Sequence, residues 1–322
     1  MKRPRILSGV QPSGKLHLGN YFGAIRQHIA LQQEGECFFF IADLHALTTI
    51  QDAPALRENV RAVALDYLAL GLDPEKTAFF RQSDIPEVTE LAWILATVTG
   101  MGLLERAHSY KDKLARGLAP SVGLFTYPVL MAADILIYRS NLVPVGQDQV
   151  QHIEMTRDMA GYFNQTFRKV FPLPEHRLDK EPVVPGIDGK KMSKSYGNTI
   201  EIFAEGKALH SSVMRIVTDS TPVEAPKDPG KDNVFALYSL FATEAEREDL
   251  ARMYRAGGFG YGEAKKMLIA KIDGHFAEAR EKRKKLASDP AVVDATLARG
   301  AERARALALE TMREVREATG LR

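Results

Sequence analysis

Residues 5–20 read RILSGVQPSGKLHLGN, an apolar run that passes through a proline- and glycine-containing turn into a segment with helical periodicity. Residues 5–10 predict a short strand, and residues 19–33 predict a helix. The free N–H groups at the start of such a helix favour phosphate, and Gly19 lets a nucleotide approach the backbone because it has no Cβ. His17 can donate a hydrogen bond to phosphate oxygens. The alternative is an ordinary capped helix start with a surface histidine.

Further apolar runs alternate with helical patterns through the first half of the chain. Residues 37–42 and 77–81 predict buried strands, and residues 54–70 between them predict an amphipathic helix. This alternation is typical of an α/β fold with a Rossmann-like, doubly wound parallel sheet that is covered on both faces. Ligands of such sheets bind beyond the carboxyl ends of the strands, where His17 and His45 follow the first two strands.

Helical patterns dominate the last third of the chain. Residues 98–120 look irregular and basic, which indicates an insertion. We therefore expect a Rossmann-type domain over residues 1–199, with an insertion around 98–140, and a helical domain over residues 200–322. The last helix is a candidate to pack back on the first domain. The remaining predicted elements are helices at 125–137 and 148–163 and a strand at 141–145.

The composition is that of an ordinary globular protein. The chain has 322 residues, of which 45% are hydrophobic and 26% are charged. Its single cysteine, Cys37, lies in an apolar run and is expected in the core, which excludes internal disulfides and cysteine-rich metal sites. No segment is apolar for long enough to be a signal peptide or to span a bilayer, so we expect a cytoplasmic protein with no membrane partner.

Charge is distributed unevenly along the chain. Residues 251–322 carry a net charge of +6, whereas residues 1–250 carry −4. A basic C-terminal part on an acidic body is typical of proteins that bind a polyanion, although a solvated helix face would give the same counts. The densest basic run is REKRKK at residues 280–285.

The pentapeptide KMSKS at residues 191–195 is the most specific chemical signal. An α-phosphate under attack gains negative charge, and the departing pyrophosphate carries more. Lys191 and Lys194, together with two serine hydroxyls on a loop that closes late, can bind that transition state more tightly than the ground state. The alternative is a solvated basic loop. If this loop and the His17 segment close on one triphosphate, the chain is an enzyme that adenylates its substrate.

The segment GQDQ at residues 146–149 lies between a predicted strand and a predicted helix. Asp148 can accept hydrogen bonds from ribose hydroxyls, and Gln149 can reach an amino or carbonyl group. Asp148 would serve equally well as a helix cap, so the residues leave both interpretations open.

Together these segments resemble the two signatures of class I aminoacyl-tRNA synthetases, the HIGH-type motif and the KMSKS motif. The first is degenerate because Asn20 stands in place of the final histidine, whereas the second is intact. Over nearly its whole length the chain is similar to the bacterial tryptophanyl-tRNA synthetases. The segments that carry this resemblance are SGVQPSG at 8–14, MAADI at 131–135, VPVG at 143–146, QHIEMTRD at 151–158 and VTDS at 217–220.

The residues also favour tryptophan independently. Tyr127, Met131 and Asp134 share one face of a predicted helix because they are spaced by four and three residues. Methionine offers a soft apolar contact to a large ring, and the related tyrosyl enzymes carry glutamine where Met131 stands. Indole has one N–H and no acceptor, so a carboxylate suits it, and a carboxylate buried without a purpose would be costly. The alternative is a helix with a functionless aspartate.

The resemblance implies an activity and partners. The chain would activate L-tryptophan with ATP and Mg²⁺ to tryptophanyl-adenylate and pyrophosphate, and would then transfer tryptophan to tRNA(Trp). No nucleophilic side chain is required, and no tightly bound protein metal site is expected. The family is dimeric, so a homodimer is implied, with anticodon binding by the helical domain.

The resemblance also implies roles for individual residues. Asp134 would accept from the indole N–H, and Tyr127 and Gln149 would contact the α-amino group, with Met131 and His45 in the same site. Gln147 stands where the family often has glutamate, so its side-chain contact is open. Lys113, Lys191, Lys194 and His17 would act on the phosphates. The ATP site would comprise Gln11, Pro12, Ser13, Gly19, Asn20, Gly146, Gln147, Asp148, Val184, Lys191, Met192, Ser193, Lys194 and Ser195.

Three other interpretations fit fewer residues. A tyrosine-specific synthetase is opposed by Met131. A small nucleotidyltransferase is opposed by the length, the helical C-terminal part and the intact lysine loop. A non-catalytic tRNA-binding protein would be expected to have lost Lys191, Lys194 or the Gly19 turn, all of which are present.

Overall fold

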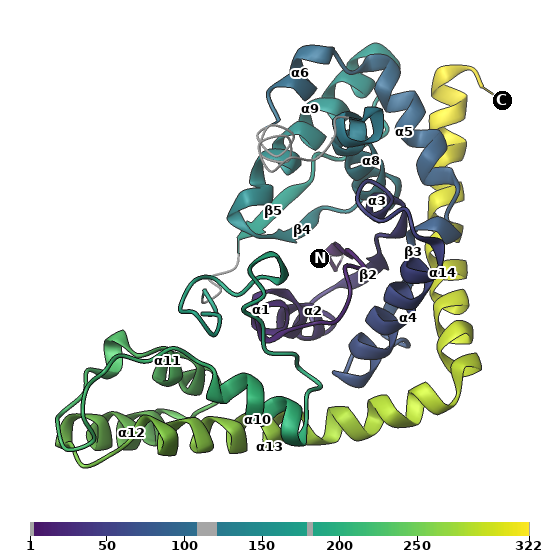
Figure 1. The fold of residues 1–322 in the computed structure, drawn as a ribbon. Helices are drawn as coiled ribbons and strands as arrows, with labels where there is room; N and C mark the ends of the chain where they lie inside the picture. The colour runs from purple at the N-terminus through teal and green to yellow at the C-terminus, as the bar shows by residue number, and fades with distance from the viewer. Residues whose placement is uncertain (1–2, 108–120, 179–182, 322) are drawn as a thin grey trace.

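The computed structural model describes residues 3–107, 121–178 and 183–321. Figure 1 shows an upright α/β block, built around a sheet, and a helical arm that extends sideways from its base. The sheet has five parallel strands in the order β3-β2-β1-β4-β5, which confirms the predicted Rossmann-like α/β fold. The strands are β1 (Arg5–Val10), β2 (Glu36–Ile41), β3 (Thr77–Arg81), β4 (Leu142–Val145) and β5 (Glu175–Leu178).

The central strands are apolar because both faces of the sheet are covered. In β2, Cys37 and Phe39 pack into one hydrophobic cluster, whereas Phe38 and Phe40 pack into another on the opposite face. The first cluster includes residues of α4 (Ala53–Ala69), and the second includes residues of α5 (Glu87–Val98), α8 (Val122–Ile137) and α9 (Val150–Thr166).

The helix expected after the first strand is present, with a local irregularity. It consists of α1 (Leu18–Asn20), a π-helical turn η1 (Tyr21–Ile25) and α2 (Arg26–Leu31) in direct succession. Such π-turns occur frequently at functional sites, and nothing in the sequence indicated this one. A second short helix, α3 (Asp43–Ala46), follows β2 and carries His45.

The expectation of an irregular segment over residues 98–120 was wrong for residues 101–105. Residues Met101–Glu105 form α6, and Leu103 and Leu104 are buried in the same hydrophobic cluster as α5 and α8. Residues 108–120 lie outside the described ranges. Strand β5 was not predicted because its polar residues give no apolar run, as is usual for an edge strand.

The arm is helical, and its longest helix leads back to the block. The glycine-rich segment at residues 257–260 separates α12 from α13, and Gly257 has a φ of +73°, which few other residues adopt. In Figure 1, α13 runs along the base of the molecule and α14 rises beside the sheet. The helices are α10 (Gly206–Met214), α11 (Asn233–Ser239), α12 (Glu244–Ala256), α13 (Tyr261–Ser288) and α14 (Pro290–Thr319).

Helix α14 packs directly against the edge strand β3. A Cβ on Gly300 would lie 2.0 Å from the carbonyl oxygen of Phe79, so the two backbones approach as closely as glycine allows. Arg305 pairs with Glu87 at 2.8 Å, which ties the helix to α5. The strand that would otherwise form an open edge of the sheet is therefore covered.

We expect the Gly300→Ala variant to lose about 1–3 kcal/mol of free energy of unfolding, because the new methyl group would overlap the Phe79 backbone. Gly274→Ala in α13 is a matched control, since a Cβ there meets nothing within 4 Å. That control should gain up to about 1 kcal/mol from helix propensity. Urea unfolding measures both, and equal stability of the two variants would contradict this packing.

Candidate active site

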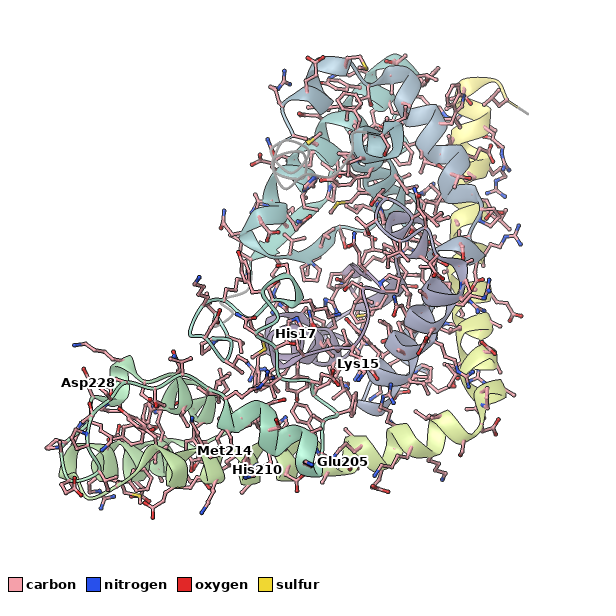
Figure 2. All side chains as sticks on the ribbon, viewed as in Figure 1. Lys15, His17, Glu205, His210, Met214 and Asp228 are labelled. Atoms are coloured by element: carbon pink, nitrogen blue, oxygen red, sulfur yellow. The ribbon has the colours of Figure 1, made fainter. Side chains whose placement is uncertain are left out.

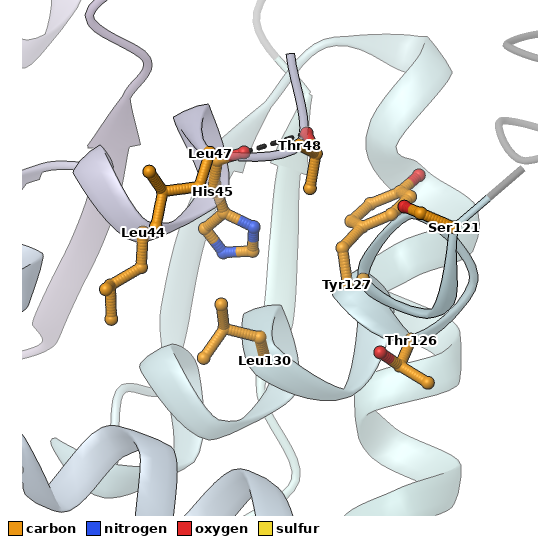
Figure 3. A pocket seen from close by; sticks show the side chains of 9 residues that line it. Leu44, His45, Leu47, Thr48, Ser121, Thr126, Tyr127 and Leu130 are labelled. Atoms are coloured by element: carbon orange, nitrogen blue, oxygen red, sulfur yellow. Dashed lines mark hydrogen bonds between the residues drawn. The ribbon is translucent and has the colours of Figure 1, made fainter. Parts of the chain in front are cut away.

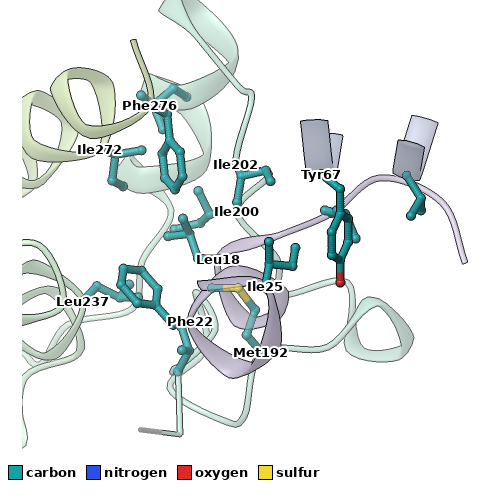
Figure 4. Packing of buried hydrophobic residues seen from close by; sticks show 14 of the residues in the cluster. Leu18, Phe22, Ile25, Tyr67, Met192, Ile200, Ile202, Leu237, Ile272 and Phe276 are labelled. Atoms are coloured by element: carbon teal, nitrogen blue, oxygen red, sulfur yellow. The ribbon is translucent and has the colours of Figure 1, made fainter. Parts of the chain in front are cut away.

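The two signature segments of the sequence are joined by backbone hydrogen bonds. The N–H of Leu18 donates to the carbonyl of Ile200 at 3.0 Å, and the N–H of Ile202 donates to the carbonyl of Leu16 at 3.1 Å. Figure 4 shows Leu18, Ile200 and Ile202 side by side in the core between the first helix and the arm. Residues 200–202, just after the lysine loop, are therefore fixed to the segment that starts the first helix.

Lys194 reaches the turn that follows β1. Its Nζ donates to the carbonyl oxygen of Ser13 at 2.9 Å. Burial lowers the pKa of Lys194 below its ordinary value, although Asp66 and then Glu201 act in the opposite direction. The structure thus brings together the lysine loop and the turn at residues 11–14, as a shared phosphate site requires.

His17 and Gly19 lie beneath this loop. Burial, followed by the charge of Lys194, lowers the pKa of His17 to about 4, so its ring is neutral at pH 7. Its Nδ1 is buried without a hydrogen-bond partner among the described residues. The N–H of Gly19 points at the sulfur of Met192 at 3.4 Å, which is a weak acceptor that phosphate oxygen can replace. Both groups suit an anion at the helix start.

Asn20, which replaces the last histidine of the HIGH-type motif, has a structural contact in addition to its expected place in the ATP site. Its Oδ1 accepts from the N–H of His17 at 3.0 Å, and this bond caps the first helix. Gln11 is exposed, Pro12 is buried, and the N–H of Ser13 donates to the carbonyl of Gln11 at 2.9 Å. The turn therefore has a defined shape beneath Lys194.

We expect His17→Gln to lower the rate of ATP–pyrophosphate exchange by about 10-fold or more without changing the shape of its pH profile. A histidine whose pKa is lowered to about 4 is neutral from pH 5.5 to 8, so it contributes no protonation step there. Exchange rates measured across that range for both proteins test this. An inflection near pH 6–6.5 that disappears in the variant would contradict a neutral His17.

The segment at residues 146–149 forms a short 3-10 turn before α9. Gly146 and Asp148 are exposed, and the side chain of Asp148 accepts from Gln149 Nε2 at 2.8 Å. No side chain caps either the turn or α9. The interpretation of Asp148 as an ordinary helix cap is therefore wrong, and its carboxylate stands at the carboxyl end of β4.

A cluster of polar side chains surrounds Asp134 beyond the ends of β2 and β3. Its Oδ2 lies 2.9 Å from His45 Nε2, and both of its oxygens accept from Gln82 Nε2 at 2.9 Å. Burial raises the pKa of Asp134, while the hydrogen bonds from His45 and Gln82 act in the opposite direction. The carboxylate is thus held in a fixed orientation, with Oδ1 bonded only by Gln82 among the described residues.

Gln82 was not predicted from the sequence. It follows β3 directly, at the same sheet edge where His17 and His45 follow β1 and β2, so the strand-end rule would have found it. Its amide is 1% exposed and orients Asp134. The cluster therefore has a third member that a search limited to titratable residues misses.

A cavity of about 220 Å³ lies between α3 and the start of α8 (Figure 3). His45 and Tyr127 line it, whereas Met131, Asp134 and Gln149 do not. Tyr127 and Met131 are half-buried on α8, and the hydroxyl of Tyr127 lies 2.8 Å from His152 Nε2. The structure therefore places part of the expected tryptophan site at a cavity wall and part in the core behind it. The lining residues are Leu44, His45, Leu47, Thr48, Ser121, Gly123, Thr126, Tyr127 and Leu130.

The other expected residues differ in how far the structure places them. Val184 is buried, and its carbonyl accepts from the N–H of Met192 at 2.9 Å, which fixes the start of the loop. The hydroxyls of Ser193 and Ser195 lie 2.9 Å apart. Lys191 and Gln147 are exposed. Lys113 lies outside the described residues.

Among the described residues, no three His, Cys, Asp or Glu side chains are grouped so that they could hold a metal ion. No described helix is long and apolar enough to cross a membrane.

The parallel sheet, the glycine turn at a helix start and the lysine loop that closes on it define a nucleotide-binding enzyme of the class I synthetase type. The chain belongs to the tRNA synthetases class I (W and Y), whose family model matches residues 1–277.

Relatives within this family are similar over their full length. A tryptophan–tRNA ligase of Rhodopirellula baltica is 59% identical, over 99% of this chain and 100% of its own. One of Fusobacterium nucleatum is 52% identical, over 98% of each chain. The crystal structure of Campylobacter jejuni tryptophanyl-tRNA synthetase complexed with ADP and tryptophan superposes with a TM-score of 0.95 at 49% identity, covering 98% of this chain and 99% of that one.

Proposed function

We propose that the chain is an ATP-dependent tryptophan–tRNA ligase. It activates L-tryptophan with ATP to tryptophanyl-adenylate and pyrophosphate, and then transfers tryptophan to tRNA(Trp). The relatives that are 43–59% identical carry this name, and one neighbouring structure contains ADP and tryptophan. The observation that carries the proposal is the position of Lys194 over the β1 turn, at the same carboxyl edge of the sheet as the Asp134 cluster beyond β2 and β3.

The topology of the sheet supports two adjoining subsites. Strand order reverses between β1 and β4, and ligands of doubly wound sheets bind at such a point. His17 follows β1 and Gly146 follows β4, so we place the nucleotide there. His45 and Gln82 follow β2 and β3, so we place tryptophan beside it, with its carboxylate facing the α-phosphate.

Adenylation then requires positioning and charge stabilisation rather than a nucleophilic side chain. The tryptophan carboxylate attacks the α-phosphate, and pyrophosphate leaves. Lys194 and Lys191 stabilise the charge that develops on the phosphates, while neutral His17 and the N–H of Gly19 donate hydrogen bonds to them. Mg²⁺ enters with ATP as part of the substrate and neutralises phosphate charge. Lys113 is a further proposed phosphate contact.

Selectivity follows from the acceptor in the amino-acid site. The indole N–H would donate to Asp134, and phenylalanine has no donor to replace it. A site that hydrogen-bonds its substrate rejects an analogue without the partner by roughly 10⁴–10⁵. Editing of misactivated amino acids is therefore unnecessary in this proposal.

The decisive experiment is ATP–pyrophosphate exchange with a panel of amino acids, followed by charging of tRNA(Trp). We expect exchange with tryptophan alone, and tryptophanyl-tRNA as the product. Exchange with tyrosine at a comparable rate would replace the proposal with a tyrosyl enzyme. Binding of tRNA without any exchange would replace it with a non-catalytic protein.

The helical arm is the proposed anticodon-binding part, but some cations of its basic run already form ion pairs within the chain. Arg280 pairs with Asp273 at 2.6 Å, and Lys284 pairs with Glu205 at 3.2 Å. Glu205 lies at the start of α10, below Lys15 and His17 of the block (Figure 2). The sequence left the run open between a tRNA surface and a solvated helix face, and the structure shows a third arrangement. Arg283 joins the arm to the block by pairing with Asp66 of α4, whereas Arg280 and Lys284 pair within the arm.

For Lys282 and Lys285 no ion pair is recorded among the described residues, so these two are the candidates for tRNA contact. We expect their joint neutralisation to lower the salt dependence of tRNA binding, with the slope of log Kd against log salt falling by about 2. Neutralising Lys284 is the control, because it is paired within the chain. A slope that is equal in both variants and the parent would remove the run from the tRNA surface.

We also propose a homodimer in the cytoplasm. Apolar side chains are exposed on α5, on α6 and at the start of α8, and α8 contacts both of the other helices: Trp93 is 73% exposed, Met101 62% and Val122 80%. Exposed apolar groups of this size often mark a protein interface. Sedimentation analysis tests the proposal, and a monomer at micromolar concentration would contradict it.

A further inference from the structure

Asn198, three residues beyond the lysine pentapeptide, makes more contacts within the loop than any lysine of the pentapeptide does among the described residues. Its side chain is 2% exposed. Its Oδ1 accepts from the N–H of Ser193 at 2.8 Å. Its Nδ2 donates to Asp188 Oδ1 at 2.7 Å and to the carbonyl of Lys191 at 3.2 Å.

These partners fix the orientation of the amide. The N–H of Ser193 can only donate, whereas the carbonyl of Lys191 and the carboxylate of Asp188 can only accept at neutral pH. A side chain at this position must therefore accept on one side and donate on the other. Asparagine does both, and aspartate would place a second carboxylate against Asp188.

The surrounding backbone is built around this side chain. A Cβ on Gly186 would lie 2.3 Å from Asn198 Nδ2, so glycine leaves the space that the amide fills. The carbonyl of Asn198 accepts from the N–H of Ile187 at 3.0 Å, and Gly197, with a φ of +63°, turns the chain inward just before it. The amide is thus enclosed by the hairpin of residues 185–191, which leads into the lysine loop, and by the turn at Gly197, which follows it.

The two contacts with the pentapeptide lie on the backbone between its two lysines. One is made to the carbonyl of Lys191 and the other to the N–H of Ser193, which is the residue before Lys194. The third contact joins this unit to Asp188, whose Oδ1 also accepts from the N–H of Lys190 at 3.1 Å. The amide therefore sets the spacing of the two lysine backbones and fixes both to the hairpin.

We propose that Asn198 is a positioning residue for adenylation, which holds Lys191 and Lys194 in the geometry that meets the transferring phosphate. The inference rests on the proposed function and names a residue that never touches the substrate. A misplacement of about 1 Å of groups that act on a transition state can cost roughly 10²-fold in rate. Loss of the amide should consequently reduce kcat for exchange, whereas the tryptophan site, built on other elements, should bind as before.

The test compares Asn198→Ala, Asn198→Asp and the exchanged pair Asp188→Asn with Asn198→Asp. In the exchanged pair the aspartate at 198 still accepts from Ser193 and no longer faces a second carboxylate, but the donor to the carbonyl of Lys191 and the acceptor for the N–H of Lys190 are both lost. We expect kcat to fall by about 10²-fold in both single variants, with the KM for tryptophan within twofold of the parent. The exchanged pair should therefore recover only part of the loss and stay well below the parent.

Asn164→Ala is the matched control. That amide also braces a loop, because Nδ2 donates to the carbonyl of Phe171 at 2.9 Å and Oδ1 accepts from the N–H of Val170 at 2.9 Å, but it lies at the end of α9. It should lower thermal stability and leave kcat within twofold. If Asn198→Ala does not fold, Asn198→Asp decides the question, with the same threefold limit on its kcat.

The outcomes separate this inference from the proposed function. A parent protein that catalyses no exchange with tryptophan refutes the function. A parent that is active, with Asn198→Ala within threefold of its kcat, refutes the positioning role. A rise in the KM for tryptophan that accounts for the whole loss refutes it as well.

Discussion

Replacing Lys194 with alanine is expected to lower kcat for ATP–pyrophosphate exchange by about 10²–10³-fold, the usual cost of removing a group that stabilises charge in a transition state. The lysine Nζ is held over the β1 turn by Ser13, in the position that we propose for the triphosphate. Tryptophan affinity, measured by equilibrium binding without ATP, should stay within twofold, since no contact joins Lys194 to the Asp134 cluster among the described residues.

Lys190→Ala is the control for this result. Lys190 lies in the same loop and carries the same charge, but its hydrogen bond to Asp188 is made by its backbone N–H, whereas Lys194 bonds to Ser13 through Nζ. It should change kcat by less than about threefold, whereas a general loss of positive charge would affect both variants alike. Equal losses in the two variants would mean that the loop attracts ATP without stabilising the reaction.

Replacing Asp134 with alanine is expected to lower the ratio of kcat/KM for tryptophan to that for phenylalanine by about 10²–10⁴-fold. The carboxylate accepts from His45 and Gln82, and its remaining lone pairs can accept from an indole N–H. The KM for ATP should change by less than threefold, because we place the nucleotide beyond β1 and β4, beside the lysine loop.

Asp134→Asn separates the loss of the acceptor from the loss of packing. Its oxygen can still accept from indole, although its amide nitrogen would face the donors of His45 and Gln82. We expect selectivity intermediate between the parent and Asp134→Ala. Selectivity in the alanine variant that equals the parent's would remove Asp134 from the indole contact, whatever the stability of the variant.

The strands could be predicted from the sequence wherever the side chains on both of their faces are buried. Strands β1 and β3 were predicted with their correct bounds because a covered parallel sheet requires continuous apolar runs. Strand β5 is polar and lies at an edge, and α6 is too short for its periodicity to show. The π-helical turn after Asn20 has no signal in the local sequence pattern.

The candidate site was predictable where motifs carry it and not where tertiary contacts build it. Residue type and spacing are enough to recognise His17, Gly19 and the lysine pentapeptide in the sequence. Gln82 and Asn198 are neutral amides whose function depends on partners that only the folded chain brings near. For Asn198 the hint was its place just after the loop, which says nothing about where its amide points.

The basic run near the end of α13 shows the same limit. Charge counts are local, whereas the partner of Arg283 is Asp66 on α4, 217 residues away in sequence at 2.5 Å. The counts therefore indicated a polyanion surface where part of the charge joins the arm to the block. The fold indicates which lysines are candidates to contact tRNA, whereas the composition does not.

The most direct test of the whole account is a crystal structure of the chain with a non-hydrolysable analogue of tryptophanyl-adenylate. We predict that the α-phosphate group lies between the N–H of Gly19 and Nζ of Lys194, and that the indole nitrogen lies within hydrogen-bond distance of Asp134. A phosphate bound away from both signature segments, or an indole ring directed away from Asp134, would contradict the account.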